Sequence, residues 1–352
     1  MHTTGDERIG VVARGTTRTP GGVEPLPGGR LLVRTPGRAE VHDREDFLAG
    51  RTDRPAHVLR TGEGERAAPT ADGGFVVAGP ASVRAVGPDG STRWTRPHDP
   101  WHGTGGAPAA PSVSPDGRLV SVVVPTVAPD RDKAALVHDQ GPRPDYTWDA
   151  LLLLDAGTGA VIDRKQLRSL TSGTVQAWRA DGTALGVSCW TAWHSWSTWW
   201  AQPSADGLRF LGGTWMHSVA GFLPGGGALT QRFAEHVFPD DDRDELAVYD
   251  LASAERTALL DLTELGVDPE NDEFSCAEVL DGRHVLVPGR VYPEDAPPEH
   301  RHWLVRAEGL RPRGRLDYPV PAGEEVTPLG DGTWLTRDGD LLHRWSLADA
   351  SA

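Results

Sequence analysis

Two pairs of histidines are the first candidates for chemistry in this sequence. His98 and His102 are four residues apart, and His300 and His302 are separated by one residue. Imidazole nitrogens bind transition metals and also serve as general acids or bases near neutral pH. The His300–His302 spacing admits a divalent metal ion as a weak candidate, and the sequence predicts no other cofactor.

A second set of residues could support acid–base catalysis if the protein is an enzyme. His217 follows Trp215 in the segment GGTWMHS, and His102 lies in the segment HDPWHG. Either imidazole could act as the acid or base, because histidine is the side chain that ordinarily exchanges its proton near neutral pH. Asp99 or Glu235 would then be the carboxylate that orients the ring.

The segment CWTAWHSWSTWWAQ, residues 189–202, contains five tryptophans. We predict a hairpin that turns at His194 and Ser195, with Trp193 facing Trp196 across the turn. Tryptophans at the tip of a loop are costly to expose unless they meet a ligand or a partner. The predicted ligand-binding residues are Trp101, His98, Trp193, His194, Trp196 and Trp215.

Composition excludes several other classes of function. The formal net charge is −15 and no basic stripe is visible, which argues against nucleic-acid binding. No apolar run approaches the length of a membrane span and no signal peptide is visible, so we expect a cytoplasmic protein without membrane contact. We expect Cys189 and Cys276 to be free, buried thiols. The GxSxG, HExxH, Walker A and GxGxxG signatures are absent.

These residues are positioned by a repeated phrase in which an Asp-Gly or Gly-Gly turn precedes a β-strand. Gly29, Gly73 and Gly117 follow each other at intervals of 44 residues. The other turn glycines are Gly182, Gly226, Gly282 and Gly332. A period of about 40–45 residues with four short strands per unit is typical of a β-propeller. In the third unit, the predicted strands A to D span residues 110–114, 118–124, 150–155 and 160–166.

The phrases SPDGR, residues 114–118, and LLLLDAGTGAV, residues 151–161, resemble those of the WD40/YVTN-type β-propeller superfamily. The resemblance implies an all-β fold with seven blades, each a four-stranded antiparallel sheet. The Trp-Asp pair that names WD40 repeats is missing from the expected strand ends. We predict one domain over residues 1–352, in which residues 7–14 complete the last blade, residues 325–346.

Long connections accumulate between strands B and C of a blade and between strand D and the next strand A. They include residues 125–149, 233–244 and 288–302. We call the face formed by these two kinds of connection the B–C/D–A face, and long loops gathered on one rim usually carry function. We predict a binding or scaffold protein that presents this Trp- and His-rich face to an unknown protein or small-molecule ligand. The alternative is an enzyme, of the metal-assisted lyase or hydrolase type found among propellers, with its active site at the mouth of the central channel.

Overall fold

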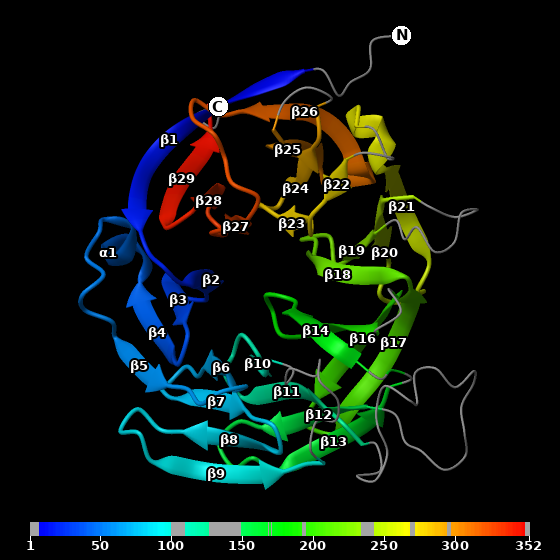
Figure 1. Ribbon diagram of the computed structural model, residues 1–352. Helices are drawn as coiled ribbons and strands as arrows, with labels where there is room; N and C mark the ends of the chain where they lie inside the picture. Colours follow the sequence, from blue (N-terminus) through cyan, green and yellow to red (C-terminus); the bar gives the residue numbers. More distant parts are fainter. Residues whose placement is uncertain are drawn as a thin grey trace. The chain divides into compact units, whose positions relative to one another are not determined.

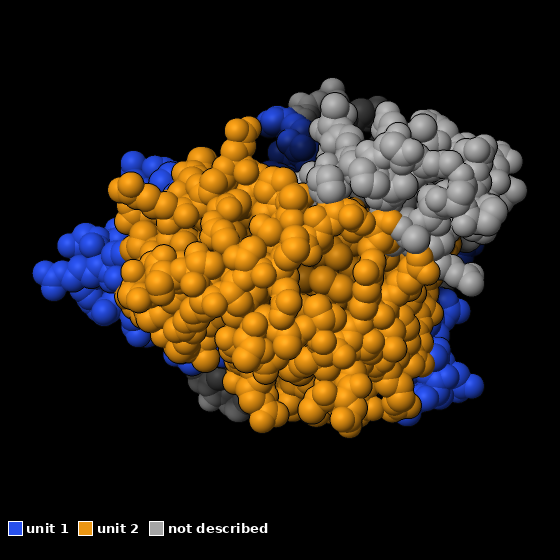
Figure 2. Space-filling model, turned by 90° about the horizontal axis from the view of Figure 1, so that it is seen from below, with its two compact units in different colours: residues 1–35, 41–55, 220–352 blue, residues 36–40, 56–219 orange. Residues whose placement is uncertain are grey.

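The computed structural model describes residues 7–99, 110–126, 149–167, 169, 171–191, 195–233, 243–267, 272–293 and 297–348. The predicted site residues outside these ranges are Trp101, His102, Trp193, His194 and Glu235. The chain divides into two compact units, which Figure 2 colours separately: residues 1–35, 41–55 and 220–352 form unit 1, and residues 36–40 and 56–219 form unit 2. That the whole chain is one domain stays a prediction.

Nearly all of the regular structure is β-sheet, and in five sheets four antiparallel strands follow each other in chain order. The first is β2 (Gly22–Leu26), β3 (Arg30–Thr35), β4 (Arg38–Asp43) and β5 (His57–Arg60). The second is β6 (Arg66–Pro69), β7 (Phe75–Ala78), β8 (Ser82–Val86) and β9 (Thr92–Pro97). The third is β10 (Ser112–Val113), β11 (Leu119–Val124), β12 (Ala150–Asp155) and β13 (Val161–Gln166). The fourth is β14 (Thr171–Trp178), β15 (Leu185–Thr191), β16 (Ser195–Ser204) and β17 (Gly207–Trp215). The fifth is β18 (His217–Phe222), β19 (Ala228–Arg232), β20 (Glu245–Tyr249) and β21 (Arg256–Asp261).

The sixth sheet has nine strands, because the N-terminal strand joins two further groups in unit 1 (Figure 1). One group is β22 (Glu273–Phe274), β23 (Glu278–Val279), β24 (His284–Val291), β25 (Glu299–Arg306) and β26 (Arg311–Asp317). The other is β27 (Val326–Pro328), β28 (Thr333–Asp338), β29 (Leu341–Leu347) and β1 (Arg8–Arg18). β1 pairs antiparallel with β29 and, at Arg8–Gly10, parallel with β26. The prediction that the N-terminal strand closes the last blade is confirmed, and the strand also reaches the preceding group.

The repeated turns have a local chemical cause. In Asp116-Gly117 and Asp181-Gly182, the carboxylate accepts a hydrogen bond from the backbone N–H two residues later, at 3.1 and 2.9 Å. These Asx-type turns end with glycine in the left-handed region, with φ of 74° and 72°. Six of the seven predicted turn glycines have a positive φ, Gly282 being the exception. The repeated phrase therefore forms the predicted turn between the first two strands of each group.

The core consists of apolar layers between neighbouring strand groups within each unit. In unit 2, Val76 and Val83 of the second sheet pack in one cluster with Val122 and Leu152 of the third. In unit 1, Leu304 packs with Trp334 and Trp345 of the last group. First strands of neighbouring groups also meet, β6 with β10 and β27 with both β2 and β23. Face-to-face packing of four-stranded sheets is the packing of propeller blades, so the β-propeller prediction is confirmed.

Helix is almost absent from the described residues, as predicted. The exceptions are α1 (Arg44–Leu48) and two 3₁₀ turns, η2 (Leu262–Leu265) and η3 (Glu308–Leu310). No helix in the described part is long and apolar enough to cross a membrane.

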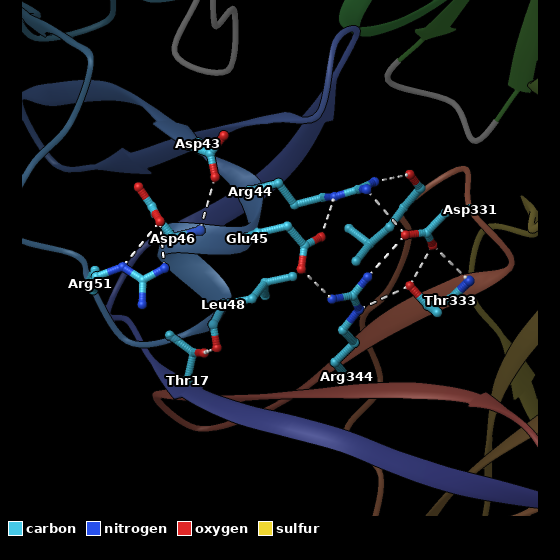
Figure 3. A network of polar contacts seen from close by, with 11 residues as sticks. Thr17, Asp43, Arg44, Glu45, Asp46, Leu48, Arg51, Asp331, Thr333 and Arg344 are labelled. Carbon is cyan, nitrogen blue, oxygen red and sulfur yellow. Dashed lines mark hydrogen bonds and ion pairs between the residues drawn. The ribbon is translucent and has the colours of Figure 1, made fainter.

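An ionic network fixes α1 to the last strand group of unit 1 (Figure 3). Arg44 donates to the backbone oxygen of Leu329 at 2.9 Å, and Arg344 lies 3.0 Å from Glu45 and 3.0 Å from Asp331. Asp331 also accepts hydrogen bonds from Thr333 at the turn before β28. The network explains how a five-residue helix, too short to be stable alone, holds a fixed position.

Candidate functional site

The tryptophan-rich hairpin forms, but its predicted register is wrong. Strands β15 and β16 pair Trp190 with Trp196 and Thr191 with Ser195, so Ser195 belongs to a strand and not to the turn. A turn at His194 and Ser195 would pair Trp199 with Trp190 and Trp200 with Cys189, whereas Trp199 faces Val187 and Trp200 faces Gly186. Strand β15 ends at Thr191 and β16 begins at Ser195. The predicted contact of Trp193 with Trp196 concerns a residue outside the described ranges.

The observed register places tryptophans on both faces of the sheet β14–β17. Trp190, Trp196 and Trp200 share one face, because side chains of directly paired residues point to the same side. On the opposite face Trp199 packs in the core cluster shared with the sheet β10–β13. Trp200 is completely buried, and Trp190, Trp196 and Trp199 are half-buried. Most of these rings therefore serve packing.

Trp215 is the exception, since 59% of its surface is exposed. It is the last residue of β17 and pairs with Ser197, which puts it on the same face as Trp199 and diagonal to it. Met216, the next residue, has a φ of 66°, in the left-handed region that residues other than glycine rarely adopt. Its N–H donates to the carbonyl of Trp196 at 2.7 Å. The chain thus makes a fixed, strained bend directly after an exposed tryptophan.

A row of buried hydrogen bonds holds the other side of this bend. The Ser188 hydroxyl lies 2.6 Å from the Thr198 hydroxyl and accepts from the N–H of Val219 at 2.7 Å. The Thr198 hydroxyl donates to the carbonyl oxygen of His217. His217 opens β18 and is 5% exposed, so its side chain is buried at the base of the bend. We call Trp215, Met216 and His217 the Trp215 corner.

The histidine at the end of the second sheet lies elsewhere in unit 2. His98 follows β9, its N–H donates to the carbonyl of Ala81 at 3.0 Å, and its Nδ1 lies 2.7 Å from the carbonyl oxygen of Asp99. Burial lowers the pKa of His98, against the opposing effect of neighbouring backbone carbonyls. His98 and His217 belong to connections of different sheets.

His300 and His302, the weak metal candidates, have different surroundings although both lie on β25. The Tyr318 hydroxyl accepts a hydrogen bond from Trp334 Nε1 at 2.9 Å and is hydrogen-bonded to His302 Nδ1, 2.8 Å away. His302 is fully buried, and burial lowers its pKa to about 4. His300 is half-buried and lines a cavity at the edge of the sheet. Within the described ranges, no three His, Cys, Asp or Glu side chains gather as a metal ion would require.

Several residues with unusual surroundings escaped the sequence analysis. Burial raises the pKa of Tyr318 far above its usual value and raises that of Glu278, on β23, to about 8. Arg315, on β26, lines the same cavity as His300. Cys276 is free but exposed, so the prediction that both thiols are buried holds only for Cys189. Alternation of side chains along β26 could have assigned Arg315 to one face of the sheet, the face on which it pairs with Trp303 of β25.

Comparison with known proteins identifies the fold and no family. No family model matches the chain, and no curated protein matches it. Among solved structures, the chain resembles BamB from Moraxella catarrhalis with a TM-score of 0.52 and 13% identity, covering 93% of this chain and 85% of that one. It resembles Kuenenia stuttgartiensis hydrazine synthase with a TM-score of 0.56 and 14% identity, covering 97% and 96%. It resembles the Dos1 propeller with a TM-score of 0.50 and 9% identity, covering 90% and 75%. At such identities the likeness concerns the β-propeller fold alone, and the WD40 label stays a prediction.

Proposed function

We propose that this propeller is a binding or scaffold protein that presents the Trp215 corner to a protein or small-molecule ligand. The observation that carries the proposal is the exposed ring of Trp215 on a strained, hydrogen-bonded bend. An exposed tryptophan is among the commonest anchors of binding interfaces, because it buries a large apolar area in one side chain.

The backbone of the corner supports a preformed binding surface. A non-glycine residue in the left-handed region costs about 1–3 kcal/mol, and such strain concentrates at functional positions. Here the bonds from Met216 to Trp196 and from Thr198 to His217 hold the strained geometry. A surface that is already ordered loses less entropy on binding.

The predicted ligand-binding residues within the described ranges all lie next to B–C or D–A connections. Trp196 is the second residue of β16, after the connection from β15, and Trp215 is the last residue of β17, before the connection to β18. His98 follows β9, the last strand of its sheet. This common position supports the choice of connections.

The proposal is tested by substituting Trp215 and a matched exposed aromatic residue on the same strand. Phe210 on β17 is 36% exposed and lies away from the corner, so Phe210→Ala is the control for Trp215→Ala. Partners would be isolated from extracts of the source cells by cross-linking to wild-type protein, and each would then be titrated against all three purified forms. We expect Trp215→Ala to weaken binding by roughly tenfold or more, as for an interface anchor, and Phe210→Ala to leave it unchanged.

Equal affinity of wild type and Trp215→Ala for every isolated partner would show that the corner is not the binding surface. Circular dichroism and melting temperature of each variant would establish that both remain folded.

A further inference from the structure

A cavity of about 590 Å³ opens in unit 1, beside strands β25 and β26. Its walls are residues 297–301, at the start of β25, and residues 315–322, which comprise the end of β26 and the segment after it. The volume is within the range of small-molecule binding sites. We call it the β25–β26 cavity.

Three arginines lie on one face of three neighbouring strands, and two of them, Arg301 and Arg315, line this cavity. Arg315 of β26 is paired with Trp303 of β25 and with Arg8 of β1. Arg301 lies two residues before Trp303, so its side chain points to the same face as the other two. We call Arg301, Arg315 and Arg8 the arginine row.

Only the outer two members of the arginine row have a carboxylate partner. Arg301 donates two hydrogen bonds to Glu299, at 3.2 and 2.9 Å. Arg8 forms an ion pair with Asp317 at 3.5 Å. Across the described residues, no side-chain hydrogen bond or ion pair is formed by the guanidinium of Arg315. Three cations thus share two anions, and Arg315, in the middle, has only the through-space attraction of the carboxylates that Arg301 and Arg8 bind.

The surroundings of Arg315 weaken its hold on its proton. Arg315 is half-buried, and this burial, followed by the charges of Arg301 and Arg8, lowers its pKa against the opposing charges of Asp317 and Glu299. An oxyanion in the cavity would compensate the charge, and a guanidinium binds carboxylate or phosphate through two parallel hydrogen bonds.

Two other features of the walls define what the rest of the ligand should be. His300 Nδ1 is buried and has no hydrogen-bond partner within the described ranges, so one polar group of the wall is available. Pro297, Pro298, Pro319 and Pro321 supply flat apolar surface, and Val320 is 45% exposed. Apolar walls around a few polar groups favour an organic body over a bare inorganic ion.

We propose that the β25–β26 cavity binds a small organic anion, whose carboxylate or phosphate group pairs with Arg315 and whose apolar body packs on the proline-lined wall. The cavity shares no residue with the Trp215 corner, so this proposal and the proposed function can fail separately.

Isothermal titration calorimetry with benzoate and phenyl phosphate tests the proposal, with benzyl alcohol and inorganic phosphate as the neutral and the non-apolar probes. Arg315→Gln should weaken binding of phenyl phosphate by roughly tenfold or more, because a charge-assisted pair is lost. Arg311→Gln is the matched control, since Arg311 is an exposed arginine on the same strand and does not line the cavity. Arg315→Lys keeps the charge without the paired geometry and should bind with intermediate affinity.

Saturable binding of benzoate or phenyl phosphate, weakened by Arg315→Gln and unchanged by Arg311→Gln, would support the proposal. Absence of binding to wild type, equal binding by Arg315→Gln, or equal weakening by Arg311→Gln would overturn it. Inorganic phosphate binding as tightly as phenyl phosphate would refute the role of the apolar wall. The Arg315→Lys titration remains decisive if Arg315→Gln does not fold.

Discussion

The sheet β14–β17 is rich in tryptophan and the strands β24–β26 are rich in histidine and arginine, and the two regions place these side chains in opposite ways. In the first, five of the tryptophans pack at least partly inside, and one ring, Trp215, is displayed at a strained bend. In the second, His302 is buried beside the half-buried Tyr318, and Arg301 and Arg315 line a cavity. One region offers an apolar anchor, and the other offers an unpaired charge.

The difference shows that a local excess of one residue type does not identify a site. Trp200 and Trp215 have the same side chain and lie on paired strands, yet one is completely buried and the other mostly exposed. His300 and His302 are two residues apart, yet only His302 is fully buried. Strand register and the position of the strand end decide which of these groups reaches solvent.

Deleting residues 1–15 should have the largest effect of all, and the loss of stability should fall on the second region much more than on the first. The deletion removes most of β1, whose pairing covers both β26 and β29. About ten lost backbone hydrogen bonds, at roughly 0.5–1.5 kcal/mol each, should lower the melting temperature by at least about 10 °C. Calorimetry measures the loss, and hydrogen exchange should show it in β26 and β29 and much less in β14–β17. A deletion of residues 1–6 is the control, and an unchanged melting temperature on removing 1–15 would contradict the pairing.

Substituting two tryptophans of the same sheet tests the contrast inside the first region. Trp200→Ala should destabilise the fold by about 3–5 kcal/mol, because it leaves a cavity in the core. Trp215→Ala should change stability by less than about 0.5 kcal/mol, as exposed substitutions do. Urea unfolding measures both values. Comparable losses for the two variants would mean that Trp215 is a packing residue.

Removing the hydroxyl of Tyr318, in the second region, should destabilise the fold more than removing that of an exposed tyrosine. Tyr318→Phe removes the hydroxyl that joins Trp334 Nε1 and His302 Nδ1, so two buried nitrogens lose their partner. At about 1–3 kcal/mol for each unsatisfied group, the cost should be at least about 2 kcal/mol. Tyr292→Phe is the control, because its hydroxyl bonds to Glu273 at the surface and its loss should cost under about 0.5 kcal/mol. A small effect at both positions would show that the Tyr318 hydroxyl does not stabilise the second region.

Acid should destabilise the second region through His302. Its pKa is about 4 in the folded protein and about 6.5 in an unfolded chain, so between these values the unfolded state binds the extra proton. The stability contribution is complete above pH 6.5 and is lost as the pH falls toward 4, by up to about 3 kcal/mol. The measurement is the free energy of unfolding from pH 7 to 4 for wild type and His302→Gln. Parallel curves would show that His302 does not carry the acid sensitivity.

The sequence predicted the strands and turns well, because their causes are local. Residues 150–155 form the predicted strand β12, and Asp116-Gly117 forms the predicted turn. An apolar run flanked by Asp-Gly turns contains nearly all the information that such a hairpin needs.

The candidate sites were predicted less well, because they depend on which strands become neighbours. The turn of the tryptophan hairpin has no glycine or asparagine to mark it, so its register was misplaced. Arg301 and Arg315 lie on consecutive strands, but nothing local encodes that β1, which carries Arg8, pairs with β26. The strained φ of Met216 has no signature in the residue itself.

The pairing of β1 with β29 has a consequence for biosynthesis. Arg14 on β1 binds Ser346 on β29, a residue 332 positions later in the chain. At about 5–20 residues per second, a ribosome needs tens of seconds to make that length, and β1 waits for its partner throughout. A strand with open edges is prone to pair with other chains, and charged side chains discourage such pairing. Arg8, Arg14 and Arg18, spaced along β1, are suited to keeping the nascent strand apart until β29 emerges.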